Sequence, residues 1–489
     1  MLLFAALIAP HAEAATTATA AFNQKLGNYF ERIRKDPNAP PGFIIVVVHG
    51  DRTIFAKAYG VRDVRSKAPL MLDNPIYTGS TTKAYTGLLA AELDRRGLVP
   101  LSTNLKDLWP TLTLPNGIDP SAVTALKFLS HSAPISDSGL TFISNETGEW
   151  TVDTVPQHLA KYAKPMNKPF QYSNFGPFMY SVMVQKRLGL RYSEALRRFV
   201  LQPFGLSETS ARLEDFRPEQ LGRCNTVDPS SSGWQTVAPK PTPLLNAAGG
   251  VYTSANDAAA FLKAFTSDGR SEQGRIPAES LRKTVAPTSN QDEDTWGFHR
   301  AHYGLGWDIG TYKAATLWLR AGVYSGCRTM YVVFPEQKLG VGMLTLSDVA
   351  GNAFNASAIQ QAYDYWTGAP GADAEAIKRI AQFHNDAIES AAELRKPANP
   401  GIPVSARALR QYEGRYHNDR LGTMAVRLER GRLRAHLGLF TLNLTPTGPD
   451  RFENQAGLEL EVETVAFSRA ADGRIAAMSW GDRLFTRLN

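Results

Sequence analysis

The chain changes from strand-like to helix-like sequence at Ser80-Thr81-Thr82-Lys83. Pro75 to Tyr77 reads as a short strand, and an apolar run from about Ser80 to Arg96 reads as a helix that stops at Gly97. Residues three apart share one side of a helix, so the Ser80 hydroxyl and the Lys83 amine can meet. Unpaired N–H groups at the helix start favour negative charge beside Ser80. The stretch predicts a serine nucleophile activated by a desolvated lysine.

The same Ser-x-x-Lys pattern occurs a second time, at Ser280-Leu-Arg-Lys283. This copy follows Pro277 in a polar stretch, and no buried strand precedes it. We interpret it as a surface segment without chemistry. Context, and not the pattern alone, distinguishes the two copies.

Tyr172-Ser173-Asn174 precedes an expected helix from Phe175 to Leu188, which predicts that these side chains project from a loop. A polarised Tyr172 can relay the serine proton, and the Asn174 amide can hold Lys83 or a substrate carbonyl. The alternative is that Tyr172 is an ordinary packed loop tyrosine.

Arg320-Ala321-Gly322 lies in a block from Leu317 to Leu346 that reads as three successive strands. A glycine at position 322 lets the backbone approach a ligand closely. The N–H of Val323 would then be the second oxyanion donor, opposite that of Ser80. The alternative for Arg320 is a solvated strand residue.

In this order, Ser-x-x-Lys, Tyr-x-Asn and a basic-x-Gly strand resemble the serine β-lactamase and penicillin-binding protein superfamily. The Tyr-Ser-Asn version is similar to its class C, esterase and D-aminopeptidase branch. The stretches Leu245 to Ser254 and Tyr303 to Trp307 also look like landmarks of that family. The resemblance covers roughly Phe22 to Trp366.

The resemblance implies that Ser80 is the acylated nucleophile, with Lys83 and Tyr172 handling its proton and Asn174 binding substrate. Arg320 stands where relatives carry lysine or histidine. An arginine is effectively always protonated, so it cannot exchange protons, although its fork suits a substrate carboxylate or a polarised Tyr172. This departure argues against β-lactamase activity of the usual kind and leaves ester or peptide hydrolysis open.

Strand-like and helix-like stretches are segregated along the chain, which predicts the α+β class. We expect a signal peptide at residues 1–14 and a β-lactamase/transpeptidase-like domain at 15–370, an antiparallel sheet flanked by helices. A helix and proline-containing linker would follow at 371–403. Residues 404–489 carry about eight short alternating strands, which predict a small antiparallel β-barrel or half-barrel; it resembles a lipocalin-like appendage.

The 489 residues are 43% hydrophobic and 20% charged, as in soluble globular proteins. A formal charge of +7 without basic runs argues against nucleic-acid binding. We expect no cofactor, no metal and no integral membrane segment after processing, and a secreted or periplasmic location. Cys224 and Cys327 are compatible with one disulfide or with two buried thiols.

We therefore expect a serine hydrolase that forms an acyl-enzyme with an ester, a D-amino-acid peptide or a β-lactam-like amide. Its partner would be a small-molecule or peptide acyl substrate, with cell-wall peptides among the candidates. The alternative is a non-catalytic protein that uses the same fold to bind peptidoglycan or a peptide. Intact Ser80, Lys83 and Tyr172 argue against that alternative, and Arg320 favours it.

Overall fold

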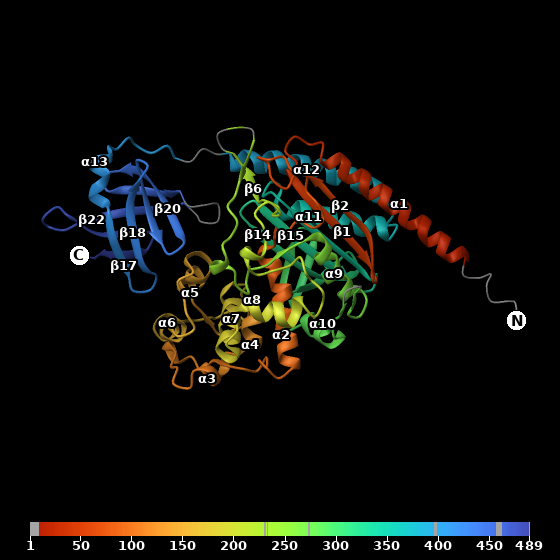
Figure 1. Cartoon of the computed structure of the whole chain (residues 1–489), viewed down its shortest axis with the longest axis horizontal. Coiled ribbons are helices and arrows are strands. Elements are labelled where there is room, and N and C mark those ends of the chain that lie inside the picture. Colours follow the sequence, from red (N-terminus) through yellow and green to blue (C-terminus); the bar gives the residue numbers. More distant parts are fainter. Residues whose placement is uncertain are drawn as a thin grey trace.

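An antiparallel sheet of eight strands forms the centre of the larger domain (Figure 1). The computed structural model describes residues 9–228, 231, 233–271, 274–395, 399–455 and 462–488. Most of the predicted signal peptide, residues 1–8, lies outside the described residues, as does Pro397 of the predicted linker. In spatial order the strands are β11 (Ser289–Thr295), β12 (Phe298–Tyr303), β13 (Asp308–Tyr312), β14 (Ala315–Tyr324), β15 (Cys327–Phe334), β16 (Leu339–Thr345), β1 (Gly42–His49) and β2 (Arg52–Gly60).

Strand β1 shows why the sheet is the core of this domain. Its side chains alternate between two hydrophobic clusters, with Ile44, Val46 and Val48 in one and Phe43, Ile45 and Val47 in the other. Successive side chains of a strand point to opposite faces, so a strand that is apolar at every position is covered on both sides.

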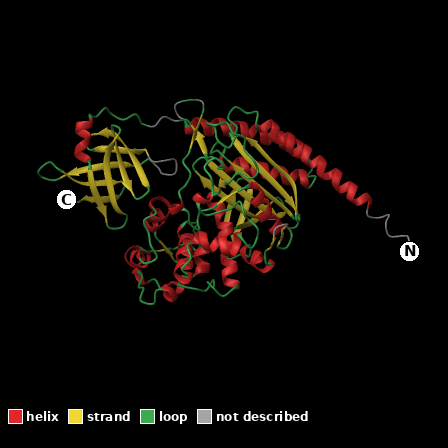
Figure 2. Ribbon diagram, viewed as in Figure 1, coloured by secondary structure: helices red, strands yellow, loops and turns green. Residues whose placement is uncertain are grey.

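Three helices cover one face of the sheet, and the rest of the domain lies on the other (Figure 2). The first group is α1 (Ala9–Ile33), α11 (Gly351–Trp366) and α12 (Ala372–Leu394). The second comprises α2 (Thr82–Arg95), α3 (Leu105–Leu108), α4 (Ala125–Leu129), α5 (Ser138–Phe142), α6 (Thr154–Tyr162), α7 (Phe175–Leu188), α8 (Tyr192–Leu196), α9 (Ala255–Thr266) and α10 (Ala278–Thr284).

Short elements complete this domain. The described residues form four two-stranded pairs: β3 (Ile76–Tyr77) with β8 (Tyr252–Thr253), β4 (Ile135–Ser136) with β5 (Lys164–Pro165), β6 (Asn225–Val227) with β7 (Trp234–Thr236), and β9 (Arg270–Ser271) with β10 (Gly274–Arg275). Two further turns matter below: the 3-10 turn η1 (Gly79–Thr81) and the π-helical turn η4 (Ile143–Thr147). A disulfide joins Cys224 to Cys327, so the pairing that the sequence left open is made.

The C-terminal segment forms a closed antiparallel barrel of eight strands, which lies beside α5 (Figure 1). A short helix, α13 (Ala406–Leu409), precedes β17 (Gly414–Asn418), β18 (Gly422–Glu429), β19 (Arg432–Leu437), β20 (Phe440–Gly448), β21 (Arg451–Gln455), β22 (Thr464–Arg469), β23 (Ile475–Trp480) and β24 (Arg483–Arg487). Pairing of β17 with β24 closes the barrel.

The predicted α+β class and the C-terminal barrel are confirmed, and the barrel is complete instead of half-open. The block from Leu317 to Leu346 contains three strands, β14 to β16, as expected. Among the described helices, none combines the length and apolarity needed to cross a membrane.

Candidate active site

Ser80 lies in η1, which continues directly into α2, so the predicted helix begins with a tighter turn. Two glycines let this turn pack against β14. A Cβ on Gly79, whose φ is +52°, would lie 2.6 Å from the Val323 carbonyl oxygen. A Cβ on Gly322 would lie 1.9 Å from the Thr78 carbonyl oxygen. Larger residues would force the turn and the strand apart.

Lys83 is 1% exposed, and its ammonium group makes three hydrogen bonds. Its Nζ atom lies 2.9 Å from Ser80 Oγ, 2.8 Å from Asn174 Oδ1 and 2.7 Å from the carbonyl oxygen of Ala248. Burial, aided by the positive charge of Arg320, lowers the pKa of Lys83. The Lys83 amine therefore lies beside Ser80 and gives up its proton more readily than an exposed lysine does.

Tyr172 stands on the loop before α7, as predicted, with 42% of its side chain exposed. Lys83 Nζ lies 5.0 Å from the centre of its ring, and the Arg320 guanidinium lies 5.2 Å from it. Removal of the phenol from water opposes ionisation, but the charges of Arg320 and Lys83 outweigh this and lower the pKa of Tyr172 to about 8. Tyr172 is thus the titratable group whose ionised form two cations favour.

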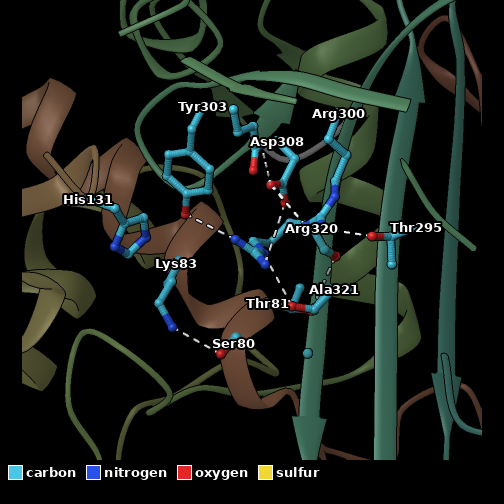
Figure 3. Close-up of polar contacts among 12 residues, drawn as sticks. Ser80, Thr81, Lys83, His131, Thr295, Arg300, Tyr303, Asp308, Arg320 and Ala321 are labelled. Carbon is cyan, nitrogen blue, oxygen red and sulfur yellow. Dashed lines mark hydrogen bonds and ion pairs between the residues drawn. The ribbon is translucent and has the colours of Figure 1, made fainter. Parts of the chain in front are cut away.

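Arg320 is buried on β14, with 5% of its surface exposed, so the alternative of a solvated strand residue is wrong. Figure 3 shows its guanidinium between Tyr303 and Asp308. Arg320 Nη1 donates to the Tyr303 hydroxyl at 3.0 Å, and Nη2 lies 3.5 Å from an Asp308 carboxylate oxygen. Burial opposes the charge, but Tyr172 and Asp308 stabilise it and raise the pKa of Arg320. The cation beside Tyr172 is therefore permanent.

His131 lies beside the cluster formed by Lys83, Tyr303 and Arg320 (Figure 3). Its ring lies 4.6 Å from that of Tyr172 and 4.7 Å from that of Tyr303, measured between centres. The backbone N–H of Ser173 donates to its Nδ1 at 3.3 Å. Burial and the cations of Lys83 and Arg320 hold the pKa of His131 well below its usual range, so the ring is neutral. His131 therefore supports the Tyr172 loop without adding charge.

The structure brings together Ser80, Lys83, Tyr172, Asn174 and Arg320. The backbone of Gly322 and Val323 lies against η1, the turn that carries Ser80. Their predicted catalytic, substrate-binding and oxyanion roles remain predictions. The Val323 side chain points outward and is 56% exposed.

Sequence reasoning missed Asp308 and Tyr303 as the residues that hold Arg320, and the Ala248 carbonyl as an acceptor for Lys83. Tyr303 and Ala248 belong to stretches whose sequence resembles the family, but the resemblance assigned no role to either residue. A strand pattern does not reveal which side chains of neighbouring strands pair.

The interpretation of Ser280 as a surface residue is wrong. Ser280 is 1% exposed, and its hydroxyl donates to the Glu92 carboxylate on α2. Lys283 instead pairs with Asp94 at 2.6 Å. Both residues of this copy thus bind carboxylates of α2, and Ser280 is buried despite its polarity because its hydroxyl has such a partner.

A separate cavity of about 720 Å³ lies between α7, α8 and the segment around Trp150, and its lining includes Asn246 but none of the cluster around Ser80. Within the described ranges, no three His, Cys, Asp or Glu side chains gather in a way that could hold a metal ion. His299 lies beside Asp294 and His302 beside Asn290.

Two curated proteins are similar to this chain over much of its length. Penicillin-binding protein 4 of Amycolatopsis lactamdurans is 24% identical over 346 residues, covering 66% of this chain and 85% of that protein. The unguisins hydrolase ungD of Aspergillus violaceofuscus is 23% identical over 429 residues, covering 80% and 74% respectively.

Among solved structures, the octameric penicillin-binding protein homologue from Pyrococcus abyssi aligns with a TM-score of 0.60 at 20% identity, covering 95% of this chain and 99% of the other. At that identity the likeness concerns the fold, and it includes both domains. The family model described as Beta-lactamase matches residues 30–364. The chain therefore belongs to the beta-lactamase family.

Proposed function

We propose that this protein is a serine hydrolase that works through an acyl-enzyme on Ser80. The observation that carries the proposal is the hydrogen bonding of Lys83. Two of its three contacts are to oxygens that can only accept, Asn174 Oδ1 and the Ala248 carbonyl. In the neutral amine both N–H bonds are then occupied, and the lone pair is directed at Ser80 Oγ, 2.9 Å away. Lys83 is therefore oriented as an acceptor for the serine proton.

Tyr172 is the alternative proton acceptor at the same serine, for the state in which Lys83 is protonated and its charge favours the phenolate. Its pKa of about 8 gives an appreciable ionised fraction near neutral pH. Arg320 maintains this ionisation without taking part in proton exchange, because it stays protonated. An arginine in place of the lysine or histidine of relatives therefore keeps the electrostatic role of a cation while removing any role in proton transfer.

The acyl transfer would follow in two steps. Ser80 Oγ attacks the substrate carbonyl carbon, its proton passes to Lys83 or Tyr172, and the N–H groups of Ser80 and Val323 bind the oxyanion. Collapse of the tetrahedral intermediate expels the leaving group, which takes up that proton. Water then attacks the ester on Ser80, releases the acid and restores the hydroxyl.

The substrate is an acyl donor of the ester, D-amino-acid peptide or β-lactam class. The guanidinium of Arg320 is buried and already bonded to Tyr303 and Asp308, so it does not by itself select a substrate with a carboxylate. The disulfide between Cys224 and Cys327 fits the proposed secreted or periplasmic location, because disulfides persist in oxidising compartments. The barrel would then be the lipocalin-like appendage that its sequence resembles.

Turnover of a nitrophenyl ester and of a penicillin tests the proposal, with Ser80→Ala and Ser280→Ala measured side by side. We expect Ser80→Ala to lose turnover with little change in melting temperature, since Ser80 is a partly exposed surface-turn residue. Ser280→Ala should keep its turnover. Hydrolysis that survives Ser80→Ala would exclude Ser80 as the nucleophile. No hydrolysis of either substrate by the wild-type protein would favour the non-catalytic binding protein.

A further inference from the structure

The barrel domain contacts the larger domain at α5 and η4, the continuous helical segment from Ser138 to Thr147. Phe142, the last residue of α5, packs against the hydrophobic core of the barrel. Its ring lies 5.0 Å from that of Phe440 and 5.5 Å from that of Trp480, between centres. The barrel core therefore includes a side chain of the larger domain.

An ion pair between a buried carboxylate and a partly exposed arginine holds the start of the same segment. Asp137, the N-cap of α5, is 1% exposed and accepts from Arg420 Nη2 at 2.8 Å. Its other carboxylate oxygen lies 2.9 Å from His158 Nδ1, and His158 Nε2 donates to the Arg420 carbonyl at 3.0 Å. Arg420 lies just before β18, so a single barrel residue binds both Asp137 and α6.

The end of the segment is held by a barrel turn. The backbone N–H of Leu439 donates to the Thr147 carbonyl at 3.1 Å. A Cβ on Gly438 would lie 2.5 Å from that same oxygen, so the turn between β19 and β20 is in direct contact with η4. The barrel thus fixes both ends of a segment whose second half is a π-helix, a rare geometry that is frequent at functional sites.

The middle of η4 is hydrogen-bonded to the loop that contains Ala248, whose carbonyl accepts from Lys83. Asn246, which is 4% exposed, donates from Nδ2 to Asn145 Oδ1 at 3.1 Å and to the Ser144 carbonyl at 3.4 Å. Its Oδ1 accepts from the backbone N–H of Ala248 at 2.8 Å. The carbonyl of Ala248 then accepts from Lys83 at 2.7 Å.

We propose that Asn246 is a positioning residue for Lys83 and that the barrel, through Arg420 and the α5–η4 segment, holds Asn246 in place. This inference rests on the proposed function, because it assigns the barrel a part in orienting the proposed base. Each link is a hydrogen bond or ring contact between packed groups, so displacement of η4 shifts the peptide that orients Lys83 toward Ser80. The barrel is then an integral support of the acylation step.

The test compares Arg420→Ala with Arg427→Ala in the full chain. Arg427 is exposed on β18 of the same barrel and, within the part of the chain that the structure describes, has no hydrogen bond or ion pair with α5 or η4, which makes it a matched control. Single-turnover kinetics with a nitrophenyl ester give the acylation rate constant and the burst amplitude separately. A purely structural loss lowers the amplitude through misfolded protein, whereas a positioning loss lowers the rate constant at full amplitude.

We expect Arg420→Ala to lower the acylation rate constant by about 2- to 30-fold, the range of coupling found between sites joined by packed elements. Asn246→Ala should lower it also, and the losses of the double variant should not multiply, because both act through one contact chain. Arg427→Ala should match wild type. Equal rate constants for Arg420→Ala and Arg427→Ala, or losses that multiply, would overturn the proposal. If Arg420→Ala does not fold, Arg420→Lys takes its place in the test, because lysine keeps the positive charge but lacks the guanidinium fork.

Hydrogen exchange at the Ala248 amide distinguishes failure of this inference from failure of the proposed function. The measurement needs no substrate, since this amide is bonded to Asn246 Oδ1. Faster exchange in the peptide around Ala248 for Arg420→Ala, but not for Arg427→Ala, would support the barrel contact even if no ester is hydrolysed. Unchanged exchange would contradict it whatever the activity.

Discussion

The two Ser-x-x-Lys segments of this chain have the same spacing and different surroundings. Ser80 lies in a 3-10 turn before α2, and Lys83 Nζ is 2.9 Å from its hydroxyl. Ser280 and Lys283 lie within α10 and bind separate acidic residues, Glu92 and Asp94. In the first segment the lysine's other partners are neutral carbonyl oxygens, and in the second its partner is a carboxylate.

This difference decides which lysine can act as a base. The partner of Lys283 is the Asp94 carboxylate, whereas Lys83 is bonded to Ser80, Asn174 and the Ala248 carbonyl. Burial of Lys83, with the cation of Arg320 nearby, disfavours its ammonium form and lowers its pKa, although Tyr172 opposes this shift. Spacing brings a hydroxyl and an amine to one side of a helix, but the neighbours of the amine determine its chemistry.

The largest effect is expected from Lys83→Ala set against Lys283→Ala. Loss of the proposed base should slow acylation by about 10²- to 10⁴-fold, the usual contribution of a general base. Lys283→Ala removes a partly exposed ion pair and should leave the acylation rate unchanged. The comparison is measured by stopped-flow release of nitrophenol. Similar losses in both variants would show that the difference in surroundings does not matter.

An intermediate effect is expected from Arg320→Met, which removes the permanent cation from the site. Ionised Tyr172 is the proposed active form, so activity is present above its pKa and is lost as the pH falls through it. The wild-type kcat/KM should therefore have an ascending limb near pH 8. Without Arg320, less positive charge offsets the effect of burial on Tyr172. The pKa of Tyr172 therefore rises, and the ascending limb moves to higher pH.

A pH–rate profile of both proteins measures this shift. Below the limb, each unit of displacement lowers the rate about tenfold at a fixed pH, because the ionised fraction falls by that factor. Arg320→Lys is the matched control, since it retains a cation and should keep the limb closer to that of wild type. A limb that does not move in Arg320→Met would contradict the assignment of Tyr172.

The smallest effect on activity is expected from Ser280→Ala, whose consequence is for stability. Removing the hydroxyl takes one donor from the buried Glu92 carboxylate and should lower the free energy of unfolding by about 1–3 kcal/mol. Burial opposes the charge of Glu92, but Arg95 and Ser280 outweigh it and lower its pKa. This stabilisation is present above the ordinary pKa of a glutamate and is lost as the pH falls through the lowered value.

Denaturant unfolding of Ser280→Ala and wild type at neutral and acidic pH tests this. The stability difference should shrink once Glu92 is protonated. A difference that is the same at both pH values would mean that the Ser280 hydroxyl does not stabilise the charged form.

Much of the site could be predicted because its residues lie in local patterns. One turn carries Ser80 and Lys83, and one loop carries Tyr172 and Asn174. The short spacing along the chain therefore predicts that the two residues of each pair lie close together. The strand block and the barrel were predictable from alternation of apolar residues. The burial of Ser280 was not, because it depends on Glu92 and Asp94, which are almost 190 residues away in sequence.

Other features were beyond sequence patterns for a related reason. The Asp308–Arg320–Tyr303 arrangement depends on the register of β12, β13 and β14. The Ala248 acceptor is a backbone carbonyl, which no side-chain pattern reports. The contact of Arg420 with Asp137 joins two domains, and nothing local to either residue indicates it.

The most direct test of the central claim is the intact mass of the protein after incubation with a penicillin or a nitrophenyl ester, followed by peptide mapping of any adduct. The account predicts a single added acyl group on the peptide that contains Ser80, absent from Ser80→Ala and present in Ser280→Ala. An adduct on another residue, or no adduct with any acyl donor of the proposed classes, would contradict it.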